Sequence, residues 1–422
     1  MAGIRHRTQI YDADTGNVVR NLARRGPPAP GTGVEVSRYD HPHRFDLKDY
    51  RLNYTGPALF FGYNIDDGLL IGGGVTHRRY AFRREPYASE QTLVGNYAPA
   101  RGAYQSALHG AVYERVWGKT DLHVVSQFYG PQLLYNFFGI GNNTQNYAVE
   151  HGDQATNRSV NRDYRVRFDR FYVAPTLERK LFTFGKVGFG PQLDRFRVQE
   201  SPIGAVIADS INAAGGAYQN ERFGIRSSDF QINTYLGGLV YLDFGAQSTP
   251  KDPRIGIKWH NEAQYDFQLG SNGLRYGRLA SELKAYLTPN FPFRLTYAGR
   301  VGWMHNIGDY RFYQANTLGG TTNLRGYRRT RFAGRSSVYA NFEARLHLFK
   351  FNAYLFPGTF GVLGLADAGR VYSGNDTRTG FAALHTGFGG GAFVNILDQA
   401  VINATYSVGE ERLVLVGFDF LF

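Results

Sequence analysis

Cysteine is absent from this 422-residue chain, and methionine occurs only twice. Without thiolates the chain cannot build a disulfide framework, a thiolate zinc site or an iron–sulfur site. No run of 18 apolar residues occurs either, which excludes transmembrane helices. The hydrophobic content of 43% is nevertheless ample for a folded protein, so the composition also argues against a disordered chain.

Glycine and aromatic residues are what the chain has in excess. It contains 52 Gly, 32 Phe and 29 Tyr, whereas glycine makes up roughly 7% of ordinary proteins. This composition argues against a helical bundle. The net charge of +12 is compatible with binding to nucleic acid or to an anionic membrane surface. Because the charges are scattered singly and form no blocks, we expect no nucleic-acid partner.

A period of two residues repeats along most of the chain. In residues 255–269, Ile257 and Trp259 share an apolar face, and Lys258 and His260 share a polar one. Such alternation predicts β-strands with one apolar face. The predicted strands run to about 10–17 residues, well beyond the usual 5–6 of globular strands. A tilted transmembrane strand needs roughly 9–11 residues, and charged inward faces suit a wet lumen with lipid outside.

We therefore predict an all-β fold, an antiparallel barrel of about sixteen strands that is integral to an outer membrane. The predicted strands cover 33–40, 54–65, 69–83, 101–117, 121–134, 161–179, 182–198, 230–246, 254–270, 274–288, 292–306, 336–349, 360–372, 382–395, 399–408 and 411–422. Short turns alternate with long connections at 135–160, 199–229 and 307–335, as periplasmic turns alternate with extracellular loops in such barrels. An even number of strands places both termini in the periplasm.

The beginning of the chain differs from the rest. A basic start is followed by no apolar segment of a signal peptide, and the Pro-rich stretch at 26–31 is typical of a stiff linker. We expect residues 1–32 to form an N-terminal periplasmic extension or linker and residues 33–422 to form the transmembrane barrel.

The end of the chain is rich in alternating apolar residues. Phe418, Phe420 and Phe422 share one face of the last predicted strand with Val414 and Val416. A terminal strand that ends on Phe resembles the signal by which outer-membrane barrels are recognised for insertion. The alternative interpretation is an ordinary hydrophobic strand.

One loop carries a more specific resemblance. The segment 318–332 contains Leu324-Arg-Gly-Tyr327 before the fifth strand from the end. An apolar residue followed by Arg-Gly-Tyr in this position resembles the BamA/TamA surface-antigen superfamily of outer-membrane barrels. The resemblance implies a sixth extracellular loop that folds back into the lumen, with Arg325, Gly326 and Tyr327 at its tip.

The resemblance also implies acidic partners for Arg325 on the barrel wall, namely Glu343 and Asp367. A guanidinium keeps its charge and offers a fixed fork of donors, so carboxylates in a confined lumen could hold a long loop in one conformation. Glu343 lies on the polar face of its predicted strand. Strict alternation places Asp367 on the same face as Leu363 and Leu365, so its assignment requires a β-bulge near Gly364 or Gly369.

The N-terminal half resembles barrels from Bacteroidota, on the segments 54–68, 91–97 and 136–144. Those barrels often follow a calcineurin-like metallophosphoesterase domain. The metal-binding motifs of that domain do not occur in this sequence, and residues 1–32 are too few for it or for the periplasmic POTRA repeats of BamA relatives. The resemblance therefore concerns the barrel part only.

Three functions are compatible with these features. The first is insertion of outer-membrane proteins, or protein translocation, through a lateral seam between the first strand, near 33–40, and the last strand, at 411–422. The second is a passive pore or transporter. The third is a membrane anchor for a periplasmic metallophosphoesterase outside this chain. The expected partners are outer-membrane lipid and lipopolysaccharide, client β-barrel or secreted proteins, and accessory lipoproteins.

Catalysis by this chain is not expected. The eleven His residues are dispersed without the spacing of a catalytic triad or a metal site. The triglycine segments at 72–74 and 389–391 are not followed by a helix, so they do not resemble phosphate-binding loops. We therefore predict no catalytic residues, no metal ligands and no cofactor.

Overall fold

The computed structural model describes residues 52–64, 68–81, 87–99, 105–144, 146, 164–199, 224–249, 251–270, 273–289, 293–352, 357–373, 384–397, 400–418, 420 and 422. The barrel strands are β1 (Tyr54–Asn64), β2 (Gly68–Arg79), β3 (Ser89–Tyr97), β4 (Gln105–Trp117), β5 (Thr120–Asn136), β6 (Arg165–Phe182), β7 (Gly185–Val198), β8 (Ile232–Gln247), β9 (Ile255–Leu269), β10 (Arg275–Leu287), β11 (Arg294–Gly308), β14 (Ser336–Asn352), β15 (Pro357–Tyr372), β16 (His385–Ile396), β17 (Ala400–Val408) and β18 (Arg412–Phe418). The remaining elements are the 3-10 turns η4 (Ser227–Phe230) and η5 (Phe312–Gln314) and the short strands β12 (Asn316–Leu318) and β13 (Phe332–Gly334).

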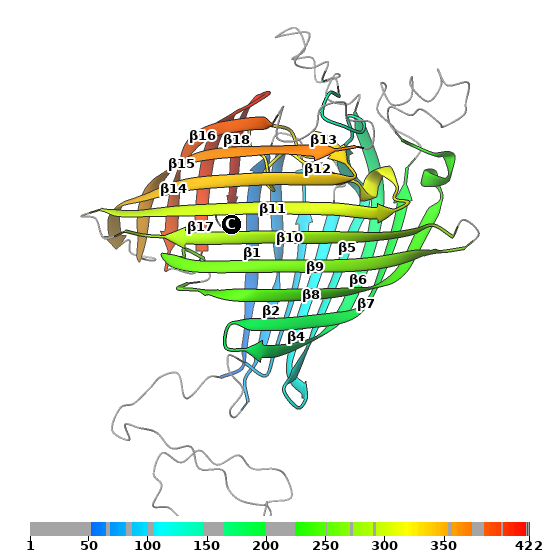
Figure 1. The fold of residues 1–422 in the computed structure, drawn as a ribbon. Helices are drawn as coiled ribbons and strands as arrows, with labels where there is room; N and C mark the ends of the chain where they lie inside the picture. Colours follow the sequence, from blue (N-terminus) through cyan, green and yellow to red (C-terminus); the bar gives the residue numbers. More distant parts are fainter. Residues whose placement is uncertain are drawn as a thin grey trace, which may run out of the picture.

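Sixteen strands of the described chain pair antiparallel in one closed barrel, and β12 and β13 form a separate small hairpin (Figure 1). The pairing of β1 with β2 runs from Tyr54 opposite Arg78 to Asn64 opposite Gly68. The ring is closed by β1 and β18, which in the described part of the chain share one registered position, Tyr63 opposite Val416. The closure is therefore the most weakly paired line in the wall. No described helix is long and apolar enough to cross a bilayer.

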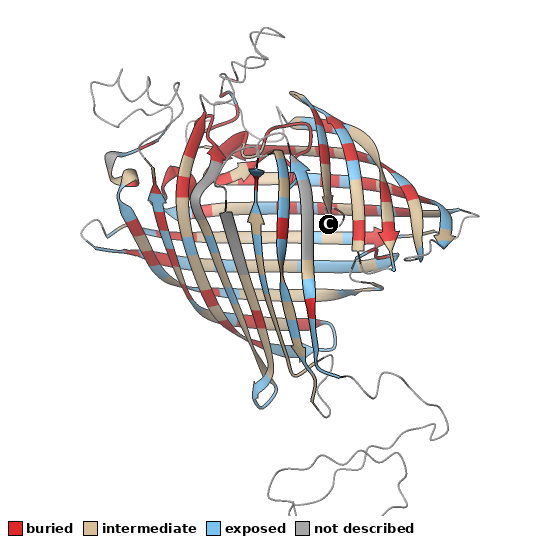
Figure 2. Ribbon diagram, turned by 180° about the vertical axis from the view of Figure 1, so that it is seen from behind, coloured by how far each residue is buried: buried red, intermediate tan, exposed pale blue. Residues whose placement is uncertain are grey.

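The apolar faces of the strands point outward, away from the interior. On β9, the side chains of Ile257 and Trp259 are 55% and 47% exposed. Asp266 and Gln268, further along the same strand, are buried. Buried and exposed residues alternate along the strands in the same way around the wall (Figure 2). This reversal of the soluble pattern is the arrangement of a barrel surrounded by lipid, with polar groups in the lumen.

The all-β barrel predicted from the sequence is confirmed, but two of its strands differ. The predicted strand at 33–40 lies outside the described residues, and β3 (Ser89–Tyr97) was not predicted. The face of β3 that carries the apolar residues Leu93 and Tyr97 also carries Gln91 and Gly95. The alternation of apolar and polar residues is therefore weak on this strand. The prediction that the 33–40 segment meets the last strand at the seam is wrong, because β1 pairs with β18.

The change of first strand also moves one connection. Because successive strands alternate in direction, the β1–β2 connection belongs to the same rim as the long connections, and not to the short-turn rim on which it was predicted. Counted along that rim, the 309–335 connection between β11 and β14 is the sixth. It is the position predicted for the loop that folds inward.

Strict alternation holds in the wall around Asp367, and only the assumption that the face of Leu363 and Leu365 points away from the lumen is wrong. The side chains of Leu363, Leu365 and Asp367 all face the interior, and the β14–β15 register shifts only between His347 and Phe349. The predicted bulge near Gly364 or Gly369 is therefore wrong. Apolar residues can face the lumen here because Phe420 packs against Leu363 and Leu365 inside the barrel.

Candidate functional site

The loop of residues 309–335 lies inside the barrel, where most of its residues are buried. Its hairpin places Leu318 opposite Phe332. These two side chains pack with Leu324 and Tyr327 against Val371 and Tyr339 of the wall. The apolar residues of the loop thus give it a core of its own on the inner surface of β14 and β15, which fixes the tip in place.

Arg325 at this tip lies between the two predicted carboxylates. Its Nε and Nη2 donate to the two oxygens of Asp367, both at 2.7 Å, and its Nη1 donates to Oε1 of Glu343. Its backbone N–H also donates to Asp367, at 2.9 Å. The Arg325 side chain is 5% exposed, Glu343 1% and Asp367 0%. Burial opposes the charge of Arg325, but the hydrogen bond to Asp367 and the charge of Glu343 outweigh it and raise the pKa of the guanidinium.

Gly326 allows the loop tip to approach the β17–β18 turn closely. Its φ is +87°, and an added Cβ would lie 2.6 Å from the backbone nitrogen of Gly409. The carbonyl of Gly326 accepts a hydrogen bond from the backbone of Glu411, at 3.1 Å. On the other side of the tip, a Cβ on Gly387 would lie 2.0 Å from the carbonyl oxygen of Arg325. Gly326 is therefore required both by its positive φ and by the close contact, and Gly387 is required by the close contact alone.

Tyr327 completes the tripeptide by anchoring to β16. Its hydroxyl donates to the backbone carbonyl of Thr386 at 3.1 Å, and its ring packs against Phe332 and His385. Burial raises the pKa of Tyr327, so the hydroxyl stays protonated and remains a donor. Each residue of the tripeptide thus contacts a different part of the wall.

Two further arginines of the loop bind the β17–β18 turn, and the sequence analysis does not single them out. Arg328 donates to Glu411 at 2.8 Å. Arg331 donates to both carboxylate oxygens of Glu410, from Nε at 2.6 Å and from Nη2 at 2.8 Å. Arg331 also donates to Thr144, which belongs to the long β5–β6 connection. The adjacent acidic residues Glu410 and Glu411 are the sequence feature that could have indicated partners for the Arg-rich loop.

The end of the chain lies in the lumen beside this network. Strand β18 ends at Phe418, whereas Phe420 packs with Phe393 and Val401, and Phe422 with Tyr286 and Ala298. The expectation that Phe420 and Phe422 share one face of the last strand with Val414 is wrong, because Val414 is exposed and both phenylalanines are buried. The described side chains beyond Phe418 turn inward because the interior offers aromatic and cationic partners for them.

Arg345 joins this tail to the loop network. Its Nη2 donates to the carbonyl oxygen of Phe422 at 2.8 Å, and its guanidinium lies 3.8 Å from the centre of the Phe420 ring. Its Nε donates to Oε2 of Glu343, also at 2.8 Å. Glu343 therefore accepts Arg325 on one oxygen and Arg345 on the other, which compensates its burial.

The start of the loop has an anchor of its own. Arg311, fully buried, pairs with Asp229 of η4 and donates to the hydroxyl of Tyr235 at 2.8 Å. Burial raises the pKa of Asp229. The same environment opposes the charge of Arg311, but Tyr313 and the bond to Asp229 raise its pKa. The loop is consequently held at its beginning, its tip and its end.

One group among the described residues has the geometry to hold a metal ion, namely Asp121, His123 and Glu178 on the inner wall. Glu178 already accepts hydrogen bonds from Lys186 and from Tyr241, both at 2.8 Å. These contacts describe an ordinary ionic network of a barrel lumen.

The geometry defines a class of protein: a transmembrane-type β-barrel whose lumen is occupied by an inward-folded sixth loop. Comparisons with solved structures agree with this. The chain is similar to BamA from Haemophilus ducreyi lacking POTRA domains 1–3, with a TM-score of 0.58, 11% identity, and coverage of 87% of this chain and 70% of that one. It is also similar to CdiB from Escherichia coli, with a TM-score of 0.54, 11% identity, and coverage of 86% and 62%.

At this level of identity the two comparisons establish a shared fold. No family model matches the sequence, and no curated protein matches it significantly.

Proposed function

We propose that this barrel resides in the outer membrane of a Gram-negative bacterium and inserts client proteins into that membrane or translocates them across it. The observation that carries the proposal is the loop of residues 309–335, which is bound both to the wall and to the β17–β18 turn next to the seam. A passive channel has no need to hold its lumenal loop against its closing strand. The fold shared with BamA and CdiB supports the same function.

The seam between β1 and β18 would be the working edge. Among the described residues, Tyr63 and Val416 are the only registered pair of this seam, so opening it breaks few of the backbone hydrogen bonds described there. An exposed strand edge can pair with an incoming strand. In this proposal the loop stabilises the β17–β18 hairpin while β1 separates from it, so that the open edge keeps a fixed shape for the client.

The orientation belongs to the same proposal. The short turns would face the periplasm, and the loop of residues 309–335 would enter the lumen from the cell surface. The expected partners are outer-membrane lipid, client barrels or secreted proteins, and accessory lipoproteins. We infer no catalytic activity for this chain. Turnover of a chromogenic phosphodiester by the purified protein, abolished by one point substitution, would contradict that inference.

The decisive experiment is the outer-membrane proteome of the host after depletion of this protein. Broad loss of barrels, or loss of one defined client, is the expected result. An unchanged proteome would overturn the proposal and favour the passive pore. If the barrel is a passive pore, the purified protein should conduct ions in planar bilayers. If the loop and the chain end fill the lumen, its conductance should be low.

A disulfide across the seam tests the mechanism directly, because the native chain contains no cysteine. Tyr63→Cys with Val416→Cys joins a registered pair, at a spacing that disulfides tolerate. The locked barrel should fail to complement depletion, and a reductant should restore it. The matched control is Ala404→Cys with Val416→Cys, which joins β17 to β18 and leaves the seam free. Full activity of the oxidised seam variant would exclude lateral opening.

A further inference from the structure

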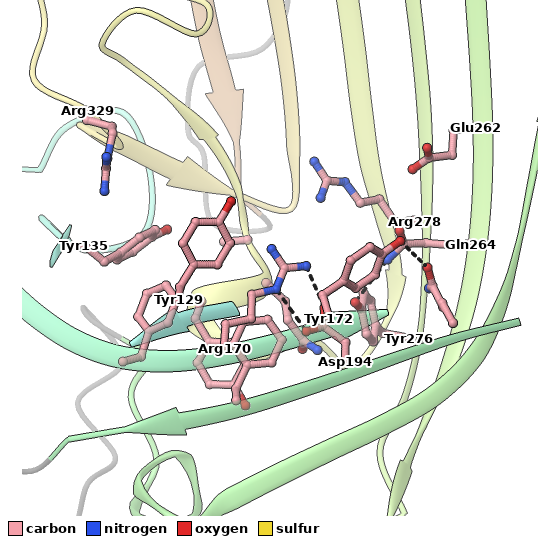
Figure 3. A pocket seen from close by; sticks show the side chains of 16 residues that line it. Tyr129, Tyr135, Arg170, Tyr172, Asp194, Glu262, Gln264, Tyr276, Arg278 and Arg329 are labelled. Atoms are coloured by element: carbon pink, nitrogen blue, oxygen red, sulfur yellow. Dashed lines mark hydrogen bonds and ion pairs between the residues drawn. The ribbon is translucent and has the colours of Figure 1, made fainter. Parts of the chain in front are cut away.

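Three arginines lie on the outer surface of β6 and β7, near the rim that carries the long connections. Figure 3 shows Arg170 of β6 and Asp194 of β7 pointing into the lumenal cavity that they line. Successive side chains of a strand point to opposite faces, so the neighbours of these two residues point outward. The outward set near this rim comprises Arg167, Asp169, Phe171, Leu193, Arg195 and Arg197.

Among the described residues, two of these arginines have no compensating charge. Asp169 lies directly opposite Arg197 in the β6–β7 register, so these two residues offset each other's charge. Arg195 is exposed and lies opposite Phe171, whose ring is 42% exposed. Within the described part of the chain, the side chains of Arg167 and Arg195 form no hydrogen bond and no ion pair. The outer surface therefore carries two unpaired positive charges beside an apolar ring.

The two unpaired charges are separated along the strands. Arg167 lies four residues before Phe171 on β6, and Phe171 is opposite Arg195 of β7. Four residues of a strand span roughly 13 Å. The surface therefore presents two guanidinium groups at separate positions, with the mutually offset pair of Asp169 and Arg197 between them. Both groups lie beside the long connections, so in the proposed orientation they belong to the outer leaflet.

An apolar groove of about 460 Å³ lies on the same outer surface, closer to the short turns. Leu177 lies opposite Phe189, and Pro191 lies opposite Gly238, which contributes no side chain. Pro191 is four residues, roughly 13 Å, from Arg195 along β7. A methylene group fills about as much space as a water molecule, roughly 30 Å³. The groove therefore has room for much of one acyl chain, at a lipid's distance from the charges.

We propose that this surface binds a glycolipid whose disaccharide head group carries a phosphate at each end, as in the outer leaflet of an outer membrane. Arg167 and Arg195 bind the two phosphates, because a guanidinium donates to phosphate oxygens through a fixed fork. One acyl chain occupies the groove over Gly238. The inference rests on the proposed function only for the orientation, which assigns the long connections to the cell surface. A phospholipid with a single phosphate engages one arginine at a time.

The test is native mass spectrometry of the purified full chain in an uncharged polyoxyethylene detergent, titrated with diphosphorylated lipid A. We expect saturable binding of one lipid A, and weaker binding of lipid A from which both phosphates have been removed. The double variant Arg167→Gln, Arg195→Gln should weaken binding about tenfold, as expected for the loss of two exposed ion pairs. Arg254→Gln is the matched control, because Arg254 is an exposed arginine at the short-turn rim.

Gly238→Leu tests the groove separately. A Cβ added at Gly238 meets only the carbonyl oxygen of Gly190, at 3.6 Å, so the leucine fills the groove without strain. Binding should weaken about tenfold, the effect of roughly two lost methylene contacts. Gly299→Leu is the matched control, because its Cβ meets nothing within 4 Å and Gly299 lines a different outer groove. Heat-dependent migration in gels verifies that each variant is a folded barrel.

The outcomes separate this inference from the insertion function. Native affinity in the arginine double variant or in Gly238→Leu, or equal binding of dephosphorylated lipid A, would overturn the proposal. Tighter binding of phosphatidylglycerol than of lipid A would overturn the assignment to a glycolipid. Because the assay uses purified protein, its failure is distinct from an unchanged outer-membrane proteome after depletion, which overturns the insertion function alone.

Discussion

Glu343 and Arg345, two residues apart on β14, link the inward loop to the end of the chain. Oε2 of Glu343 accepts from Nε of Arg345 at 2.8 Å, while Oε1 accepts from Arg325. Arg345 in turn holds Phe422. One buried carboxylate therefore connects two segments that are far apart in the sequence. A substitution in either segment should alter the packing of the other.

Arg325→Ala should release the loop tip while the barrel still forms. The substitution leaves Asp367 and Glu343 buried with fewer partners, and breaking a buried pair costs about 3–5 kcal/mol. Limited trypsin digestion of the folded barrel measures the effect, with cleavage at Arg328 or Arg329 expected to accelerate strongly. Charge reversal by Glu343→Lys should act in the same way. The exposed Arg254→Ala is the control, and native-like resistance in both lumenal variants would contradict the pairing.

Gly326→Ala should displace the tip by a different route. Its φ of +87° and the 2.6 Å approach of a Cβ to Gly409 make any side chain strained there. We expect faster proteolysis of the loop and impaired complementation, with all charges retained. Gly364→Ala on the adjacent wall is the matched control, since nothing lies within 4 Å of its added Cβ. Equal behaviour of the two variants would show that the close approach is unimportant.

The pair of Arg331 and Glu410 should contribute modestly and depend on salt. Glu410 is partly exposed, so the coupling free energy in a double-mutant cycle with alanine should be about 1 kcal/mol. For the native protein, the two single variants and the double variant, the free energy of loop opening is obtained from the rate of proteolysis. The crossed pair Arg331 and Glu411 should show less coupling, because Glu411 binds Arg328. Coupling that persists unchanged in 1 M salt would contradict a partly solvated ion pair.

The double substitution Phe420→Ala, Phe422→Ala distinguishes a role of the chain end in stability from a role as an insertion signal. Both rings are buried in the lumen, and truncation of a buried Phe typically costs about 3–5 kcal/mol. Urea unfolding of barrels refolded in vitro should therefore show reduced stability without any insertion machinery. Phe388→Ala, which changes an exposed ring, is the control. Normal stability in vitro combined with failed assembly in cells would instead assign these residues to an insertion signal alone.

The sequence predicted those features that depend on local pattern. Alternation over residues such as 255–269 requires strands with an apolar face, and the charged opposite face requires a lumen. Where the pattern is weak, as on β3 with Gly95 and Gln91 outward, prediction failed. Arg325, Glu343 and Asp367 could be named together because a known loop motif pointed to them, and the structure brings all three into contact.

Tertiary structure alone decided the rest. Closure by β1 and β18 depends on which strand edges remain free, and no residue pattern encodes that. The inward orientation of Leu363 and Leu365 depends on where Phe420 packs, and the pair of Arg331 and Glu410 joins residues that are 79 positions apart in the sequence. A period of two residues assigns a side chain to one face of a strand. Only the assembled barrel determines which groups from distant segments meet inside it, because those contacts arise from closure and packing.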